Sequence, residues 1–320
     1  MSLFADTSPF RPLGLGEMFD RAITVYVRNF VAFSAILLAL LIPISVAEYA
    51  SVANQHQGAS LAAVLQQIQH PEKSHGKTPP PTVPFSPWLL GVVVLSLFLT
   101  PFANVAVAAA VAAVYFGKAI DWRACYRAAF ARWPAILVLT LLQMATLGAF
   151  IFGLGITVGI VSFLGIFAFA ASPVLGAVVF VFAGLLFIAW MLALMLAVLA
   201  IFFAFDSLVI EQTDIGTAFS SGFTRIFART ELGKAALVGL SLLAIEFGIL
   251  ILITGVQALT LLFVKSEALS VLLASLVSLI STAFTAVLVA VYYFDVRVRR
   301  EGLDMQIGLQ QIASDASVVG

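Results

Sequence analysis

The polar side chains that could do chemistry in this chain lie within long apolar runs. Glu246 sits near the middle of one run, and Gln257 follows 11 residues later on nearly the same helical face. Asn104 and Gln143 are the other polar groups deep inside such runs. Because an unpaired ionisable group costs at least about 2.5 kcal/mol there, we predict a candidate intramembrane polar site from these four residues. Glu246 would carry a proton or cation in an interior cavity. The alternative is a protonated or hydrogen-bonded glutamate that holds helices together.

Other catalytic patterns are absent from the sequence. All three histidines, His56, His70 and His75, fall in one polar loop without a zinc-ligand pattern. No Gly-rich phosphate loop occurs, and no acid, base and nucleophile converge. Cys125 is the only cysteine, so the chain has no internal disulfide. We therefore predict that the protein is not an enzyme and that it holds neither a metal nor a cofactor.

The composition indicates the medium in which these residues must be positioned. Hydrophobic residues make up 62% of the chain and charged residues 10%, where a soluble domain has about a quarter charged residues. The formal net charge is zero, which gives no basic field for nucleic acid. The predicted fold class is an all-α integral membrane protein.

Six apolar runs are long enough to span a membrane. We place them at about residues 30–47, 87–116, 134–156, 173–205, 232–264 and 268–295 of a single six-span domain, 1–300. The Gly-rich connector 157–172 is expected to be bent or re-entrant. Residues 48–86 are predicted to form an extracytoplasmic loop, and residues 301–320 a partly disordered cytoplasmic tail.

Three short amphipathic segments come directly before the first, third and fifth runs, and we expect each to form a helix at the membrane surface. Asp121 and Asp214 are natural N-caps for the second and third of these helices. The sequence marker Phe116, Phe205 and Phe294 recurs at intervals of 89 residues near the end of each even-numbered run. We therefore predict three repeats, about 15–117, 118–206 and 207–295, each a surface helix followed by a hairpin. The arginines expected among lipid headgroups are Arg28, Arg123, Arg127, Arg132, Arg225 and Arg229.

The distribution of basic residues predicts the orientation. Of the 16 lysines and arginines, only Lys73, Lys77 and Lys265 fall on one side of this topology, which leaves 13 on the other. The positive-inside rule then places both termini in the cytoplasm.

Small residues recur at every fourth position of the last run, as Ser270, Ala274, Ser278 and Thr282. Such a row lets a second helix approach closely, so we predict helix packing in preference to a pore lining.

Three stretches carry a resemblance to a family. LGEMFDRAITVYVRNF (15–30), SLVIEQTDIGTAFSSGF (207–223) and YYFDVRVRREGLD (292–304) resemble bacterial multi-span proteins grouped with the membrane domain of glycerophosphoryl diester phosphodiesterase. The middle stretch has Phe219 and Ser220 where such segments commonly carry basic residues. The resemblance implies a bacterial protein of the cytoplasmic (inner) membrane. It does not imply the phosphodiesterase activity, which in such fusions belongs to a separate soluble barrel that this sequence lacks.

These observations favour a non-enzymatic membrane module, a scaffold or accessory that organises lipids or a membrane-protein partner. The alternative is a transporter or channel for a small or amphipathic substrate that uses Glu246.

Overall fold

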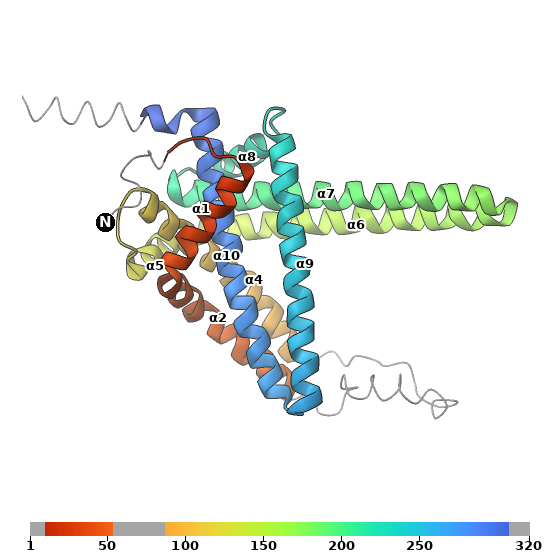
Figure 1. The fold of residues 1–320 in the computed structure, drawn as a ribbon, viewed down its shortest axis with the longest axis horizontal. Helices are drawn as coiled ribbons and strands as arrows, with labels where there is room; N and C mark the ends of the chain where they lie inside the picture. Colours follow the sequence, from red (N-terminus) through yellow and green to blue (C-terminus); the bar gives the residue numbers. More distant parts are fainter. Residues whose placement is uncertain (1–9, 54–86, 307–320) are drawn as a thin grey trace, which may run out of the picture.

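The computed structural model describes residues 10–53 and 87–306, and every regular element in these ranges is helical (Figure 1). The helices are α1 (Leu15–Arg28), α2 (Phe30–Ala53), α4 (Pro87–Tyr115), α5 (Trp122–Ala131), α6 (Trp133–Ala171), α7 (Pro173–Ile210), α8 (Ile215–Ile226), α9 (Leu232–Phe263) and α10 (Glu267–Glu301). Five of the described helices are long and apolar enough to cross a membrane, or up to six if α1 and the start of α2, bent by 76°, count as one span. The predicted all-α membrane class is therefore confirmed.

The long helices pair as three antiparallel hairpins, α2 with α4, α6 with α7, and α9 with α10. The second helices of the hairpins, α4, α7 and α10, also contact one another, so they form the centre of the molecule. Each first helix packs on the second helix of another hairpin: α2 on α10, α6 on α4, and α9 on α7.

The surface helices follow the same order. α5 packs on α4, α8 packs on α7, and α1 packs on α10. The first two contacts join neighbours in the sequence, but the third joins the beginning of the described chain to its end. The three groups of helices thus make corresponding contacts around the centre.

The predicted N-caps of α5 and α8 are confirmed. The Asp121 carboxylate accepts a hydrogen bond from the Arg123 amide at 3.0 Å, and the Asp214 carboxylate accepts one from the Thr217 amide at 3.1 Å. These caps use amides that a helix start would otherwise leave without a partner.

The surface helix α5 buries small residues and exposes several large ones. On α5, Cys125 and Ala129 are buried, whereas Trp122 and Phe130 are exposed. The apolar side chains of α5 are therefore divided between the protein interior and its surroundings. Exposed aromatic rings of this kind are typical of helices at a membrane interface.

The expected bend in residues 157–172 is wrong. α6 is one helix through Ala171, and the chain reverses at Ser172, next to Pro173 at the first position of α7. The glycines of this segment stay helical because in an apolar medium every backbone amide and carbonyl must be bonded within the chain, which outweighs the low helix propensity of glycine. Proline at the first helical position suits the start of α7.

Two other predicted boundaries shift. α10 continues past the expected end of the last span at Asp295 to Glu301, and α2 extends to Ala53, into the segment assigned to the loop. The rest of that loop, with all three histidines, and tail residues 307–320 lie outside the described residues.

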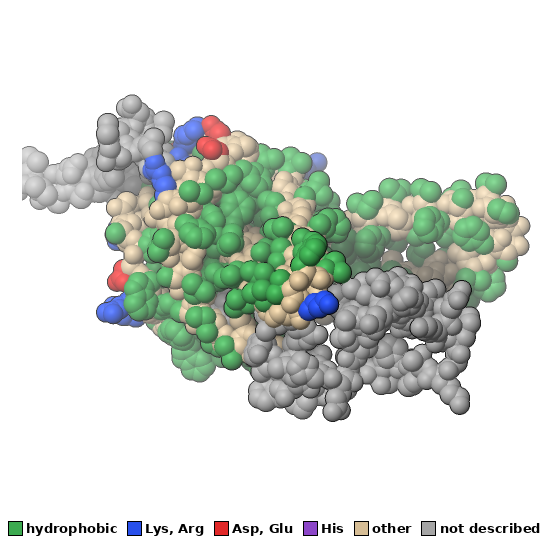
Figure 2. Space-filling view, turned by 60° about the horizontal axis from the view of Figure 1, so that its bottom comes forward, with side chains coloured by type: hydrophobic (Ala, Val, Ile, Leu, Met, Phe, Trp, Pro, Cys, Tyr) green, Lys and Arg blue, Asp and Glu red, His purple; other side chains and the backbone are tan. Residues whose placement is uncertain are grey.

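The molecule divides into a base and an arm. We define the base as residues 10–28, 116–132 and 211–235 together with the C-terminal ends of α4, α7 and α10, and the arm as residues 141–195 of α6 and α7. The arm points away from the rest of the molecule and crosses α9 in the view of Figure 1. On the face in Figure 2 the arm shows apolar side chains and backbone, while the charged side chains visible there lie on the rest of the protein.

Candidate functional site

A buried ion cluster holds α8 against α7 and α10. The Arg225 side chain of α8 is only 8% exposed, and its guanidinium lies 2.7 Å from the Glu211 carboxylate and 2.6 Å from the Glu301 carboxylate. It also donates a hydrogen bond to the Tyr293 hydroxyl at 3.2 Å. Arg297 completes the cluster 2.9 Å from Glu301. Because a buried guanidinium needs partners for its donors, this arrangement fixes the relative positions of three helices.

The cluster alters the proton affinity of two members. Burial raises the pKa of the Glu211 carboxyl, but hydrogen bonds from Arg225 and Tyr293 outweigh burial and leave the pKa below that of an ordinary glutamate. Burial lowers the pKa of Arg225, but the hydrogen bond with Glu211 and the nearby negative charges raise it above the ordinary arginine value. Both groups are therefore held in their charged forms.

A second ion cluster joins the segment before α1 to α9 and α10. Asp295 accepts a hydrogen bond from the Leu13 amide at 2.6 Å, and its other oxygen lies 2.5 Å from the Lys234 ammonium. Arg299 lies 3.1 Å from Asp295, and both Lys234 and Arg299 donate to the Leu13 carbonyl. The cluster ties the start of the described chain to its last long helix.

Each surface helix directs an arginine to the C-terminal end of its own hairpin. Arg21 of α1 lies 5.9 Å from the Tyr115 ring at the end of α4. Arg132, at the C-terminal end of α5, donates to the carbonyl of Gln212 after α7 at 3.2 Å, and Arg225 of α8 contacts α10. Since each surface helix also packs on another hairpin, these arginines link neighbouring hairpins within the base.

Helix α8 also packs on α7 without room for a side chain. A Cβ added at Gly222 would lie 2.2 Å from the Ala200 carbonyl oxygen and 2.9 Å from the Ala204 amide nitrogen. Only glycine permits this approach of two backbones.

The structure does not bring the predicted polar site together. Glu246 lies exposed on α9 and accepts a hydrogen bond from Thr285 of α10 at 2.8 Å. Asn104, Gln143 and Gln257 are half-buried on α4, α6 and α9. Among the described residues, no hydrogen bond or ion pair links any of these four to another.

The predicted headgroup arginines divide into two groups. Arg28, Arg123, Arg127 and Arg229 are exposed, as a headgroup contact requires, and Arg132 is half-buried. The prediction is wrong for Arg225, because its carboxylate and tyrosine partners enclose it within the protein.

The row of small residues on α10 is only partly packed. Ser270 is buried and Ala274 and Thr282 are half-buried, but Ser278 is exposed. The row is therefore not one continuous contact within this chain.

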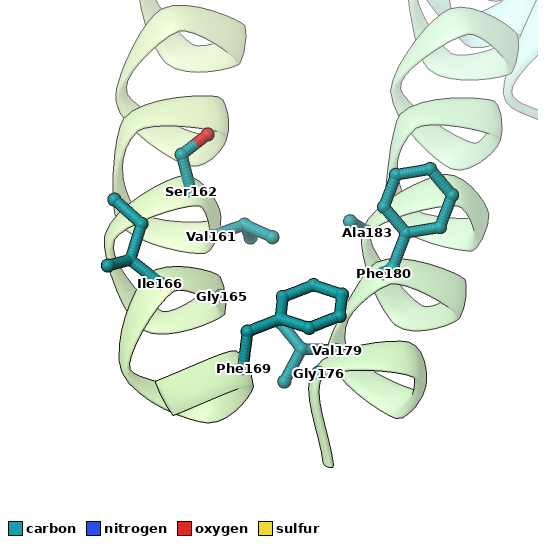
Figure 3. Close-up of a pocket in the computed structure, with 9 residues that line it drawn as sticks. All are labelled: Val161, Ser162, Gly165, Ile166, Phe169, Gly176, Val179, Phe180 and Ala183. Carbon is teal, nitrogen blue, oxygen red and sulfur yellow. The ribbon is translucent and has the colours of Figure 1, made fainter. Parts of the chain in front are cut away.

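The arm contains an apolar groove between its two helices. The groove has a volume of about 550 Å³ and is lined by Val161, Ser162, Gly165, Ile166 and Phe169 of α6 and by Gly176, Val179, Phe180 and Ala183 of α7. Figure 3 shows the Phe169 ring reaching from α6 toward α7, with Val161 and Ala183 directed into the space between the helices. A smaller cavity of about 90 Å³ shares Val161, Ser162 and Ala183 and continues along the arm to Trp190.

The groove can bind an apolar molecule but has no titratable side chain to act on it. The sequence has no charged residue from Pro134 to Phe205, and the Ser162 hydroxyl is the one polar side chain that lines the larger cavity. Within residues 10–53 and 87–306, no group of three or more His, Cys, Asp or Glu side chains is placed to hold a metal ion.

No protein-family model, curated protein or solved structure matches the chain.

The clusters of the base were not predicted. Their signal in the sequence is the pair of i,i+4 partners Asp295–Arg299 and Arg297–Glu301, which place alternating charges on one helix just after an apolar run.

Proposed function

We propose that the protein is a non-enzymatic membrane module that organises lipid, in which the base holds the arm and the arm binds acyl chains. The observation that carries this proposal is the arm groove, an apolar space of about 550 Å³ between two helices, in a stretch of the chain that has no charged residue. Its volume lies within the range of about 300–1,000 Å³ that is usual for ligand pockets.

The exposure of the arm supports lipid as its surroundings. Large apolar side chains along it, such as Phe152, Phe180 and Ile188, are 72%, 75% and 64% exposed. An exposed apolar surface of this extent is unfavourable in water, and the hydrocarbon of a bilayer is the medium in which it costs nothing.

The length of the arm constrains how it lies in the bilayer. α6 has 39 residues, or about 58 Å at 1.5 Å per residue, and the hydrocarbon core is about 30 Å thick. An upright α6 would carry apolar residues far into water. We therefore propose that the arm is strongly inclined to the membrane normal, so that its groove opens to acyl chains along its length.

The orientation of the chain in the membrane and its bacterial origin are also proposals. The cytoplasmic location of both termini follows from the distribution of basic residues. The bacterial inner membrane follows from the resemblance to the phosphodiesterase membrane-domain proteins, which itself stays a prediction. The transporter alternative also stays a prediction. Glu246, on which it depends, lines neither the arm groove nor the smaller cavity beside it.

Retention of lipid by the purified protein tests the proposal. The full chain is extracted in mild detergent, and native mass spectrometry counts the phospholipids that remain bound. Ala183→Trp places an indole in the groove and should remove one retained lipid.

The matched control is Ile151→Trp, which adds an indole to an exposed position of α6 that does not line the groove. The control should keep the wild-type number of lipids. Equal lipid numbers in both variants and the wild type would overturn the proposed role of the groove.

A further inference from the structure

The base has three corresponding places where a surface helix meets the ends of two central helices, and two of them are filled by side chains. Between α4 and α10, the Phe10 ring lies 5.9 Å from Tyr115 and 6.4 Å from Phe294. Between α7 and α10, Arg225 and its carboxylate partners occupy the space.

The third place is an open cleft between α4, α5 and the end of α7. We call this space, which has a volume of about 530 Å³, the α5 cleft. Alanines line it from both sides, Ala109, Ala112 and Ala113 from α4 and Ala124 and Ala128 from α5. Their short side chains leave the space that Phe10 and Arg225 fill at the other two places.

The cleft combines an apolar wall with one available positive charge. Lys118 lines it, and no hydrogen bond or ion pair to the Lys118 ammonium exists among the described residues. Asp121 also lines the cleft, but its carboxylate already accepts a hydrogen bond from the Arg123 amide as the α5 N-cap. The Lys118 ammonium can therefore pair with a ligand that carries an anionic group next to an apolar chain.

The cleft lies where such a ligand is found in a membrane. Its rim is the α4–α5 linker and the start of α5, an amphipathic helix with the exposed ring of Trp122 and the exposed guanidinium of Arg127. Helices of this composition lie at the boundary between headgroups and acyl chains. The alanines of α4 extend from this rim into an apolar helix.

We propose that the α5 cleft binds one anionic phospholipid, with its phosphate at Lys118 and an acyl chain against the alanine wall. This site is separate from the arm groove and would exist even if the arm bound no lipid. It also differs in selectivity, because the groove has no charge with which to distinguish headgroups.

Titration of the purified full chain with defined lipids tests this site. Native mass spectrometry measures the binding of phosphatidylglycerol, phosphatidylcholine and inorganic phosphate to the wild type and three variants. Lys118→Ala removes the ammonium, Ala124→Phe fills the cleft at an exposed position of α5, and Arg229→Ala removes an exposed arginine elsewhere in the base.

We expect phosphatidylglycerol to bind more tightly than phosphatidylcholine, and Lys118→Ala to weaken phosphatidylglycerol about fivefold. Ala124→Phe should abolish the selective site, whereas Arg229→Ala should leave it intact. Because Lys118→Ala changes an exposed side chain, it remains informative if Ala124→Phe does not fold.

Equal binding of the two lipids, or equal weakening by Lys118→Ala and Arg229→Ala, would overturn the site. Saturation by inorganic phosphate with the affinity of the lipid would also overturn it, since the acyl chain would then contribute nothing. Loss of lipid in Ala183→Trp with the selective site retained would separate the arm groove from the cleft.

Discussion

The base and the arm are held in opposite ways. In the base, Arg225, Lys234 and Asp295 are enclosed by partners of opposite charge, and α8 touches the backbone of α7 at Gly222. In the arm, α6 packs on α7, and large apolar side chains face outward. The difference indicates that specific side-chain pairs set the positions of the helices in the base, whereas the placement of the arm depends on the medium around it. The predictions below test this contrast.

Removal of the central arginine of the base should have the largest effect. Arg225→Met leaves Glu211, Glu301 and Tyr293 without their shared donor, and breaking a buried pair costs about 3–5 kcal/mol. We expect the low end of this range, because the Glu301 side chain is 30% exposed. Thermal unfolding in detergent measures the loss. Arg229→Met, at an exposed arginine, should unfold like the wild type, and equal losses in the two variants would contradict a specific role for the cluster.

The addition of a single methyl group should affect the stability of the two regions differently. Gly222→Ala places a Cβ against the backbone of α7 and should destabilise the protein by about 1–3 kcal/mol, as overpacked contacts do. At Gly155 of α6 an added Cβ would meet no atom within 4 Å. Gly155→Ala should therefore be neutral or stabilising by up to about 1 kcal/mol, because alanine favours the helix. The unfolding midpoints of the two variants provide the test, and similar destabilisation by both would remove the distinction.

Acid should weaken the base through Glu211. Its pKa in the folded protein is below the ordinary value, so its contribution to stability is complete above the unfolded pKa of roughly 4.3 and is lost as pH falls through the folded pKa. We expect the unfolding midpoint to fall at acidic pH in the wild type. Glu211→Gln should be less stable than the wild type at neutral pH, but its unfolding midpoint should fall less on acidification. Parallel pH profiles would show that Glu211 does not contribute.

The smallest effect is expected in the arm. Ile188→Ala truncates a side chain that is 64% exposed, and we expect a change within about 0.5 kcal/mol. The unfolding midpoint in detergent is the measurement. A loss comparable to that of Arg225→Met would mean that the arm is packed against a partner in the folded protein.

The sequence predicted the regular parts of the molecule because long apolar runs, caps and amphipathic spacing are local signals. The spans, the surface helices and the caps at Asp121 and Asp214 followed from such signals. The continuous α6 did not, because its glycines suggest a break in water but not in a medium where the backbone must bond to itself. The ion clusters of the base depend on residues far apart in the chain, such as Leu13 and Asp295, and no local pattern indicates such a contact.

The site residues show the same limit. Glu246 stands out in the sequence as an ionisable residue near the middle of an apolar run. The surroundings of its side of α9, however, depend on how the hairpins pack. The pattern of its own helix predicts that Arg225 contacts lipid headgroups. Its actual partners come from the loop after α7 and from α10.

The most direct test of the account is the depth of the arm in a bilayer. Cys125, the only cysteine, is replaced by serine, and single spin labels are placed at exposed positions along α6 from Met144 to Phe167 in the protein reconstituted in liposomes. The account predicts that every label is accessible to oxygen and protected from a water-soluble nickel chelate. Labels in the distal half of α6 that are open to the chelate would contradict it, because the arm would then extend into water.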